Sequence, residues 1–332
     1  MIDSCERPDI SFVIAAYNAQ DTLARAIDSA LAQTGVTVEV IVVDDCSADG
    51  TVALAEGYAD PRVTLLQQAH NQGPAAARNA GISAARGRWI AVLDADDEVR
   101  PGRLRRMIDR AAVENADIVV DNLDVVPMDG GPAKPMFAER HLQGIHLLSL
   151  ANFIQSNIIF RATYNYGYMK PIFARRFLLR HQLCFDESLK IGEDYMLLAS
   201  ALACGGRCAV EPLAGYIYHL WQGSISRVLE AHHLDAMLAS DRLFLDRFTL
   251  HGAAAKAQRL RTRSLIEARS FITLIGEIKN RSIGGVLKTA IGHPRALRHL
   301  KMPLAVRVNR ILSGAGSLPT AWGKRLQKGQ NS

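Results

Sequence analysis

Residues 10–110 alternate between short apolar runs and longer amphipathic stretches, and this alternation constrains the fold more than any other feature. Four runs have the length and the β-branched content of buried strands. The stretches between them have helical spacing or strong helix propensity. A strand–helix order repeated in this way predicts a parallel sheet with right-handed crossovers. The predicted strands are 10–16, 38–43, 63–66 and 89–93.

Acidic residues follow two of these predicted strands. Asp44 and Asp45 come after the second strand, and Asp94, Asp96 and Asp97 come after the fourth. Because the carboxyl ends of parallel strands meet at one edge of a sheet, both groups are expected to face one ligand site. Clustered carboxylates repel one another unless a cation or hydrogen-bond donors neutralise them. An acidic turn that caps the next helix is the alternative interpretation of the second group.

The bulk composition is that of an ordinary globular protein. The 332 residues suffice for two domains, or for one large domain with an appendage. No apolar run reaches the ~18–20 residues of a membrane span, and the polar N-terminus does not resemble a secretory signal. The cysteines lack the spacing of a zinc site, so we expect reduced thiols in a cytosolic protein. They are Cys5, Cys46, Cys184, Cys204 and Cys208.

Charge is distributed unevenly along the chain. Residues 251–332 contain 16 Lys and Arg but two acids, a net charge of +14, whereas residues 1–250 carry a net charge of −8. From residue 283 onwards the basic residues alternate with apolar ones, which predicts short amphipathic helices lying on an anionic membrane surface. A solvated basic face on a small helical subdomain is the alternative. No recognisable module indicates nucleic-acid binding.

Five motifs in a fixed order resemble those of the inverting family 2 glycosyltransferases, which have the GT-A fold. The motifs are 12–18, 42–51, 71–79, 93–97 and 192–194. Together they cover roughly residues 10–226, and residues 168–226 further resemble bacterial exopolysaccharide (succinoglycan-type) transferases. The resemblance implies an α/β fold with a mostly parallel twisted sheet flanked by helices. We expect a nucleotide-sugar-binding and catalytic domain at 1–228 and a basic helical extension at 229–332.

The resemblance also assigns residues to the donor nucleotide. It implies that Asp45 contacts a uracil base, and that Tyr17 or the backbone at Ala15 lines the nucleotide site. Arg78 lies on an Ala-rich predicted helix, where a charge has little packing purpose, and by resemblance it approaches the nucleotide or its phosphates. For Asp44, base contact and local turn or cap bonding both remain open.

A divalent cation is expected at the Asp-x-Asp motif. Breaking the bond between sugar and phosphate develops negative charge on the leaving diphosphate, which a cation held by carboxylates can neutralise. Asp96, helped by Asp94, suits this role, and the resemblance gives the motif the same task with Mg²⁺ or Mn²⁺. Asp97 is either a further ligand or a helix cap.

A second acidic pair, Glu193 and Asp194, is the candidate for general-base catalysis. Inverting transfer requires a base that takes a proton from the acceptor hydroxyl as it attacks the anomeric carbon. The resemblance assigns this role to Asp194, with Glu193 orienting the acceptor or the loop. The alternative is that both residues only stabilise a helix N-terminus.

Residues 218–226 depart from the family pattern. Many relatives have Tyr-Arg-x-His there, whereas this chain has His219 at the arginine position and Trp221 at the histidine position. A diphosphate contact or third metal ligand at these positions is therefore in doubt. His219 is kept as a cofactor-binding candidate, and the alternative is that it is an ordinary, partly buried histidine. The Gln-x-x-Arg-Trp pattern of processive synthases is absent, which favours transfer of one sugar per encounter.

The expected function is transfer of a hexose, with glucose favoured, from a UDP-sugar to a lipid-linked oligosaccharide in bacterial exopolysaccharide synthesis. The enzyme would work in the cytoplasm, peripherally at the inner face of the plasma membrane, without nucleic acid. Two alternatives differ in class. One is a nucleotidyltransferase that releases pyrophosphate. The other is a non-catalytic subunit that binds a nucleotide sugar within a membrane assembly complex.

Overall fold

The computed structural model describes residues 7–220 and 229–300, which divide into two compact units. Residues 7–153 and 166–220 belong to the first unit, and residues 154–165 and 229–300 belong to the second. The predicted boundary after residue 228 lies between the two described stretches. Segment 154–165, which sequence reasoning placed in the catalytic domain, belongs instead with the C-terminal helices.

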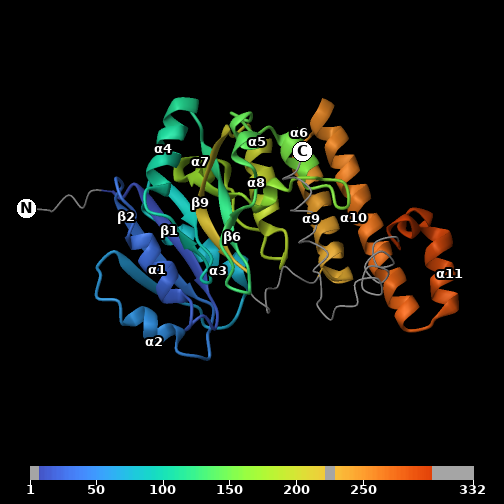
Figure 1. Ribbon diagram of the computed structural model, residues 1–332, viewed down its shortest axis with the longest axis horizontal. Coiled ribbons are helices and arrows are strands. Elements are labelled where there is room, and N and C mark those ends of the chain that lie inside the picture. The colour runs from blue at the N-terminus through green and yellow to red at the C-terminus, as the bar shows by residue number, and fades with distance from the viewer. Residues whose placement is uncertain (1–6, 221–228, 301–332) are drawn as a thin grey trace, which may run out of the picture. The chain divides into compact units, whose positions relative to one another are not determined.

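The first unit is organised around one sheet that contains nine strands in the described part of the chain (Figure 1). The order is β3-β2-β1-β4-β8-β6-β9-β5, and β7 pairs with β6. The strands are β1 Ile10–Ala16, β2 Val38–Asp44, β3 Val63–Gln67, β4 Trp89–Val92, β5 Glu98–Val99, β6 Ile118–Val126, β7 Lys134–Pro135, β8 Lys170–Ala174 and β9 Cys208–His219. Strands β1 to β4 are mutually parallel, which confirms the predicted parallel arrangement of these four strands.

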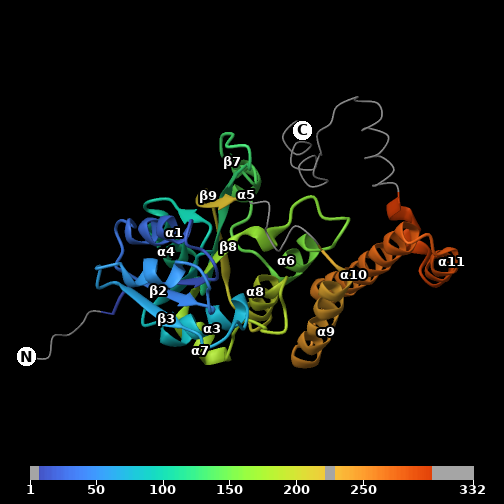
Figure 2. The ribbon, with the colours of Figure 1, turned by 90° about the horizontal axis from the view of Figure 1, so that it is seen from below.

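Helices cover both faces of this sheet, with α1 and α4 on one face and α3 and α7 on the other (Figure 2). The helices of this part of the chain are α1 Leu23–Leu31, α2 Thr51–Glu56, α3 Pro74–Ala84, α4 Arg103–Glu114, α5 Glu139–Gln143, α7 Arg175–His181 and α8 Glu193–Ala203, with the 3-10 turn η1 at Tyr166–Tyr168. The chain passes from the first unit to the second within α6, Leu150–Ser156.

Tight packing of α3 on the sheet positions the polar residues near the start of that helix. Every residue of β2 is buried, as are all but one of β1, so the apolar runs lie between two layers of helix. A Cβ at Gly81 would lie 2.4 Å from Val13 Cγ1 and 3.2 Å from Val43 Cγ2. Only glycine therefore allows α3 to lie this close to β1 and β2.

Strand β8 runs antiparallel between β4 and β6, and this brings a distant segment to the carboxyl edge of the sheet. Its register places Ile172 opposite Ala91 of β4 and Lys170 opposite Asp121 of β6. The first residue of β8 therefore lies beside the end of β4. Strand β9 runs parallel to β6, so His219 reaches the same edge.

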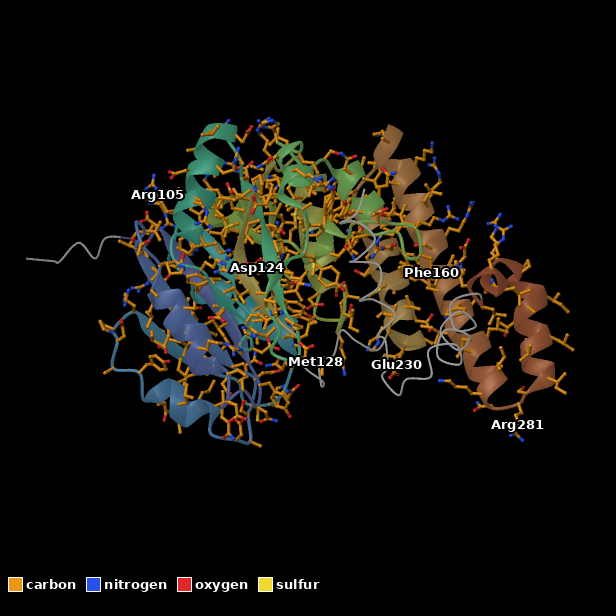
Figure 3. The ribbon with its side chains drawn as sticks, in the orientation of Figure 1. Arg105, Asp124, Met128, Phe160, Glu230 and Arg281 are labelled. Atoms are coloured by element: carbon orange, nitrogen blue, oxygen red, sulfur yellow. The ribbon has the colours of Figure 1, made fainter. Side chains whose placement is uncertain are left out.

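The second unit consists of helices packed around a small apolar core. Its elements are α9 Ala231–Arg247, α10 Gly252–Lys279, α11 Ile283–Gly292 and the 3-10 segment η3 Pro294–Leu300. Leu234 and Leu238 of α9 pack with Leu265 and Ala268 of α10. Phe160, labelled in Figure 3, joins them from segment 154–165. Its ring stacks on that of His299, with ring centroids 3.9 Å apart.

A buried ion pair between Asp241 and Arg261 links α9 to α10. Gln258 Nε2 donates a hydrogen bond of 2.9 Å to the same aspartate.

Among the described helices, none combines the length and the apolar character needed to cross a membrane.

Candidate active site

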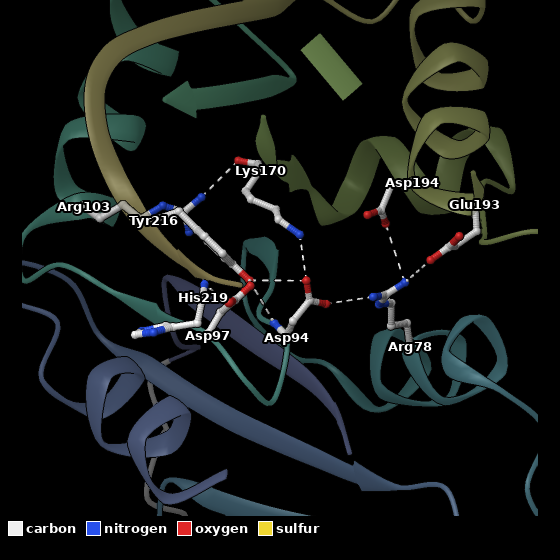
Figure 4. A network of polar contacts seen from close by, with 9 residues as sticks. All are labelled: Arg78, Asp94, Asp97, Arg103, Lys170, Glu193, Asp194, Tyr216 and His219. Atoms are coloured by element: carbon white, nitrogen blue, oxygen red, sulfur yellow. Dashed lines mark hydrogen bonds and ion pairs between the residues drawn. The ribbon is translucent and has the colours of Figure 1, made fainter. Parts of the chain in front are cut away.

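Asp94 lies at the centre of a polar network at the carboxyl edge of the sheet (Figure 4). It follows β4, and its two carboxylate oxygens meet two different cations. Arg78 Nη2 is 2.8 Å from Oδ1, and Lys170 Nζ is 2.7 Å from Oδ2. Burial acts to raise the pKa of Asp94, but the charges of Lys170 and Arg78 outweigh it and hold that pKa well below its usual range. Asp94 is therefore an anion bracketed by two positive charges.

Arg78 connects Asp94 to the second acidic pair. Its Nη1 atom lies 2.8 Å from Glu193 Oε1 and 3.6 Å from Asp194 Oδ1. Burial opposes the charged form, but the charges of Asp194, Asp94 and Glu193 raise the pKa of Arg78 further above its usual value. The guanidinium is buried and joins two carboxylate groups that lie about a hundred residues apart in the sequence.

The second acidic pair opens helix α8. Gly192 precedes the helix with a φ of 96°, a left-handed conformation that favours glycine. Glu193 is buried, whereas the Asp194 side chain is 39% exposed. Burial, and then the neighbouring Asp194 charge, raise the pKa of Glu193. Of the two predicted catalytic carboxylates, Asp194 is thus the more exposed.

Asp97 is fully buried, and both of its oxygens accept hydrogen bonds from β9. Tyr216 Oη donates to Oδ2 at 2.8 Å, and the backbone N–H of His219 donates to Oδ1 at 2.8 Å. Burial, and then the nearby charge of Asp94, raise the pKa of Asp97 well above its usual value. Helix α4 begins after Gly102 without a side-chain cap, so Asp97 does not cap it. The observed contacts attach the acidic loop to the sheet.

Asp96 differs from Asp94 because its carboxylate forms no ion pair with any described residue, whereas Asp94 pairs with Arg78 and Lys170. Arg25 of α1 donates instead to its backbone carbonyl. Burial, and then the charge of Asp94, raise the pKa of Asp96, a repulsion that a bound cation would relieve. This carboxylate therefore fits a divalent cation. Within the described residues, however, no group of three or more His, Cys, Asp or Glu side chains is arranged to hold a metal ion.

The residues expected at the nucleotide gather at the ends of β1 and β2. Ala15 is half-buried near the end of β1, and Tyr17 follows with 53% of its surface exposed. Both oxygens of Asp45 accept hydrogen bonds, from the backbone N–H of Gln72 at 2.7 Å and of Gly73 at 2.8 Å. Asp45 therefore holds the loop before α3, and its expected contact with a base remains a prediction.

The neighbouring Asp44 accepts a hydrogen bond from the backbone N–H of Ser47 at 3.0 Å, which is the local turn bonding considered above. Its Oδ1 atom is buried and has no hydrogen-bond partner among the described residues.

His219 ends β9, and its ring is engaged within the chain. Its Nε2 atom lies 2.9 Å from Glu98 Oε1, and the side chain is largely buried. These contacts are those of a partly buried histidine, and a role toward a diphosphate stays a prediction. Trp221, together with the Gly-Ser-x-Ser stretch that follows it, lies outside the described residues.

Sequence reasoning did not identify Lys170 and Tyr216 as parts of this site. In the sequence, Lys170 is followed by Pro171, and Tyr216 lies in the aromatic stretch 216–218. A lysine at the start of a strand carries no local signal of function. Only the antiparallel register of β8 beside β4 shows that Lys170 meets Asp94.

A mixed sheet with a parallel half and this acidic edge is similar to that of GT-A glycosyltransferases, and comparisons with known proteins agree. The family profile described as "Glycosyl transferase family 2" matches residues 11–177. The chain belongs to this family and is a glycosyltransferase. The nucleotidyltransferase and the non-catalytic subunit are thereby disfavoured.

Individual relatives agree with this assignment. The succinoglycan biosynthesis protein ExoO of Rhizobium meliloti is 62% identical over 304 residues, which cover 92% of this chain and 87% of that protein. The Escherichia coli protein WfaP, named a UDP-Glc:alpha-D-GlcNAc-diphosphoundecaprenol beta-1,3-glucosyltransferase, is 41% identical over 88 residues, covering 26% of this chain and 35% of WfaP. The structure of a fragment of S. aureus TarS in complex with UDP-GlcNAc has a TM-score of 0.64 at 20% identity, covering 87% of this chain and 81% of that one.

Proposed function

We propose that this glycosyltransferase moves a hexose from a UDP-sugar, with inversion, to a lipid-linked oligosaccharide during bacterial exopolysaccharide synthesis. The observation that carries the proposal is the Arg78 bridge, which holds Asp94 and the pair Glu193 and Asp194 together at one edge of the sheet. The names of ExoO and WfaP support the pathway, the glucose donor and the lipid diphosphate acceptor. The nucleotide bound to TarS supports a UDP-sugar.

In this proposal Asp194 is the general base. Its exposed carboxylate takes the proton of the acceptor hydroxyl as the oxygen attacks the anomeric carbon, and the bond from that carbon to the diphosphate breaks. Glu193 is held by Arg78 and orients the start of α8. The nucleotide lies against Ala15, Tyr17 and Asp45, where strands β1 and β2 end.

Asp96 would hold the divalent cation in this scheme, Mg²⁺ or Mn²⁺, which when bound would supply positive charge to neutralise the leaving diphosphate. Asp94 and Asp97 already accept hydrogen bonds from protein donors, so we assign them to positioning the loop that carries Asp96. Few protein ligands are needed when diphosphate oxygens and water complete the coordination, which is usual for Mg²⁺.

The experiment that tests the base assignment compares Asp194→Asn with the unchanged protein. Because a positioned general base contributes about 10²–10⁴-fold to the rate, kcat for transfer from UDP-glucose should fall by that factor. Binding of UDP, measured by calorimetry with Mn²⁺, should be unchanged. Asp109→Asn, at an exposed carboxylate on α4, is the matched control and should retain full activity.

Normal turnover by the Asp194→Asn enzyme would show that another group is the base. Asp96→Ala should abolish metal-dependent transfer, and activity that still responds to Mn²⁺ would remove Asp96 from the metal site.

We further propose that the second unit places the enzyme on the anionic inner face of the cytoplasmic membrane. Residues 229–300 contain 12 Lys and Arg against six acids. Helix α11 has no buried residue, and Ile283, Leu287 and Ile291 are exposed along one side at four-residue spacing. Exposed basic residues flank them, a combination that suits anionic lipid. They are Lys279, Arg281, Lys288, Arg295 and Arg298.

A further inference from the structure

The backbone of Lys170 is held rigidly at the edge of the sheet. Its carbonyl oxygen accepts a hydrogen bond of 3.0 Å from Arg103 Nη2. Arg103 is itself fully buried and pairs with Asp121 through bonds of 2.7 and 2.8 Å. The position from which the Lys170 side chain extends is therefore set by the core of the sheet.

The ammonium group of Lys170 has hydrogen-bonding capacity that the described residues do not use. It donates to Asp94 Oδ2 at 2.7 Å and lies 5.0 Å from the centre of the Tyr216 ring. An ammonium has three donors, and Asp94 is the single acceptor that it meets in 7–220 and 229–300. The side chain is 16% exposed, so part of it meets solvent beside the acidic edge of the sheet.

We propose that Lys170 is a further substrate-binding residue, which donates a hydrogen bond to a hydroxyl oxygen of the transferred hexose while Asp94 accepts one from the same sugar. This inference rests on the proposed function. It adds to that function a residue that sets how the sugar, rather than the nucleotide, is held.

The chemistry of the pair favours a hydroxyl group over a phosphate. A hydroxyl both accepts and donates, and so it matches an ammonium next to a carboxylate. A phosphate oxygen can only accept, and beside Asp94 it would meet negative charge. Oδ2 of Asp94 is contacted by Lys170 Nζ and, at 3.4 Å, by Tyr216 Oη, whereas Oδ1 is contacted by Arg78 and keeps a second lone pair for one more bond.

The test separates sugar binding from nucleotide binding. The dissociation constants of UDP-glucose and of UDP are measured by calorimetry, with Mn²⁺ present, for the unchanged protein, Lys170→Met and Lys170→Arg. Loss of a hydrogen bond from a charged donor should weaken UDP-glucose binding by about 10- to 100-fold in Lys170→Met. UDP binding should be unchanged, and Lys170→Arg should keep part of the affinity for UDP-glucose because it keeps the charge.

Lys134→Met, an exposed lysine on β7, is the matched control and should bind both ligands normally. An equal loss for UDP and UDP-glucose in Lys170→Met would overturn the proposal in favour of a phosphate contact or a folding role. Unchanged binding of both would overturn it in favour of a counter-ion role. Failure of the unchanged protein to bind UDP would instead contradict the proposed function itself.

Discussion

Arg78 donates hydrogen bonds to Asp94 and to Glu193, which lie 16 and 115 residues away from it in the sequence. A guanidinium is a planar fork with several donors, and so it can hold two carboxylates at once in fixed directions. The resemblance placed this arginine at the nucleotide. The observed contacts do not test that role, and we propose as an alternative that Arg78 positions the carboxylates of Asp94 and Glu193 relative to one another.

These two roles predict different behaviour of Arg78→Lys. A lysine can meet one carboxylate but cannot span both, so Asp194 should lose its alignment with the donor. We expect kcat to fall by about 10- to 100-fold, the cost of a lost charge-assisted hydrogen bond, while UDP affinity is unchanged.

Steady-state kinetics and UDP titration measure both quantities, and Arg105→Lys on the exposed face of α4 is the control. If UDP affinity falls together with kcat, the nucleotide contact implied by the resemblance is the better assignment.

At the scale of elements, Glu39 of β2 ties the amino-terminal side of the sheet together. Its Oε1 accepts from Ser11 Oγ of β1 at 2.6 Å and from the backbone N–H of Arg86, before β4, at 2.7 Å. Arg86 Nε also donates to Oε2 at 2.9 Å. Burial acts to raise the pKa of Glu39, but these hydrogen bonds outweigh it and lower that pKa below 4.5.

This lowered pKa predicts how stability depends on pH. Because the carboxyl of the folded protein binds its proton less readily than in the unfolded chain, Glu39 contributes fully above pH 4.5 and loses its contribution as pH falls through the folded-state pKa. Glu39→Gln should lower the free energy of unfolding by about 1–3 kcal/mol at pH 7. The difference from the unchanged protein should shrink only below pH 4.5.

Urea denaturation at a series of pH values measures this effect, with Glu139→Gln on the exposed side of α5 as the control. A difference that stayed constant down to pH 3 would argue against the ionised carboxylate as its source.

At the scale of the whole molecule, the two units carry different parts of the proposed function. The described site residues belong to the first unit, whereas the exposed apolar and basic side chains of α11 belong to the second. A surface of this kind can bury apolar side chains in a membrane and attract anionic lipid. Each Lys or Arg near such a membrane contributes about 1 kcal/mol to the free energy of binding.

We therefore expect the full-length protein to sediment with vesicles that contain phosphatidylglycerol, and less at high salt because charge attraction is screened. Replacing Leu287 and Ile291 together by Gln should weaken binding by at least about tenfold, since each buried apolar side chain contributes about 1.5–3 kcal/mol. Leu243→Gln, at a leucine of α9 that is 65% exposed, is the matched control. Equal binding of both variants would remove α11 from the membrane contact.

Local pattern was sufficient for most elements of the first unit. Strands β1 to β4 and helices α1 to α3 were predicted because period and propensity are encoded within each segment. The family motifs likewise named Asp94 and Asp96, because clustered acids after an apolar strand form a local signal. They also named Asp194, which lies in the first turn of a helix. Strand β5 and the reassignment of segment 154–165 were not predicted, since their partners lie far away in the sequence. Strand β7 was not predicted because it has only two residues, one of them a proline, in a stretch rich in Pro and Gly.

The sequence by itself thus determined that a parallel sheet would carry two acidic groups at one edge, together with a helix that starts on an acidic pair. Only the tertiary structure decided which charges meet. Insertion of β8 between β4 and β6 brings Lys170 to Asp94, and the packing of α3 on β1 brings Arg78 to Glu193. The physical reason is that hydrophobic periodicity depends on neighbouring residues. Strand order and register instead depend on which distant surfaces are buried together.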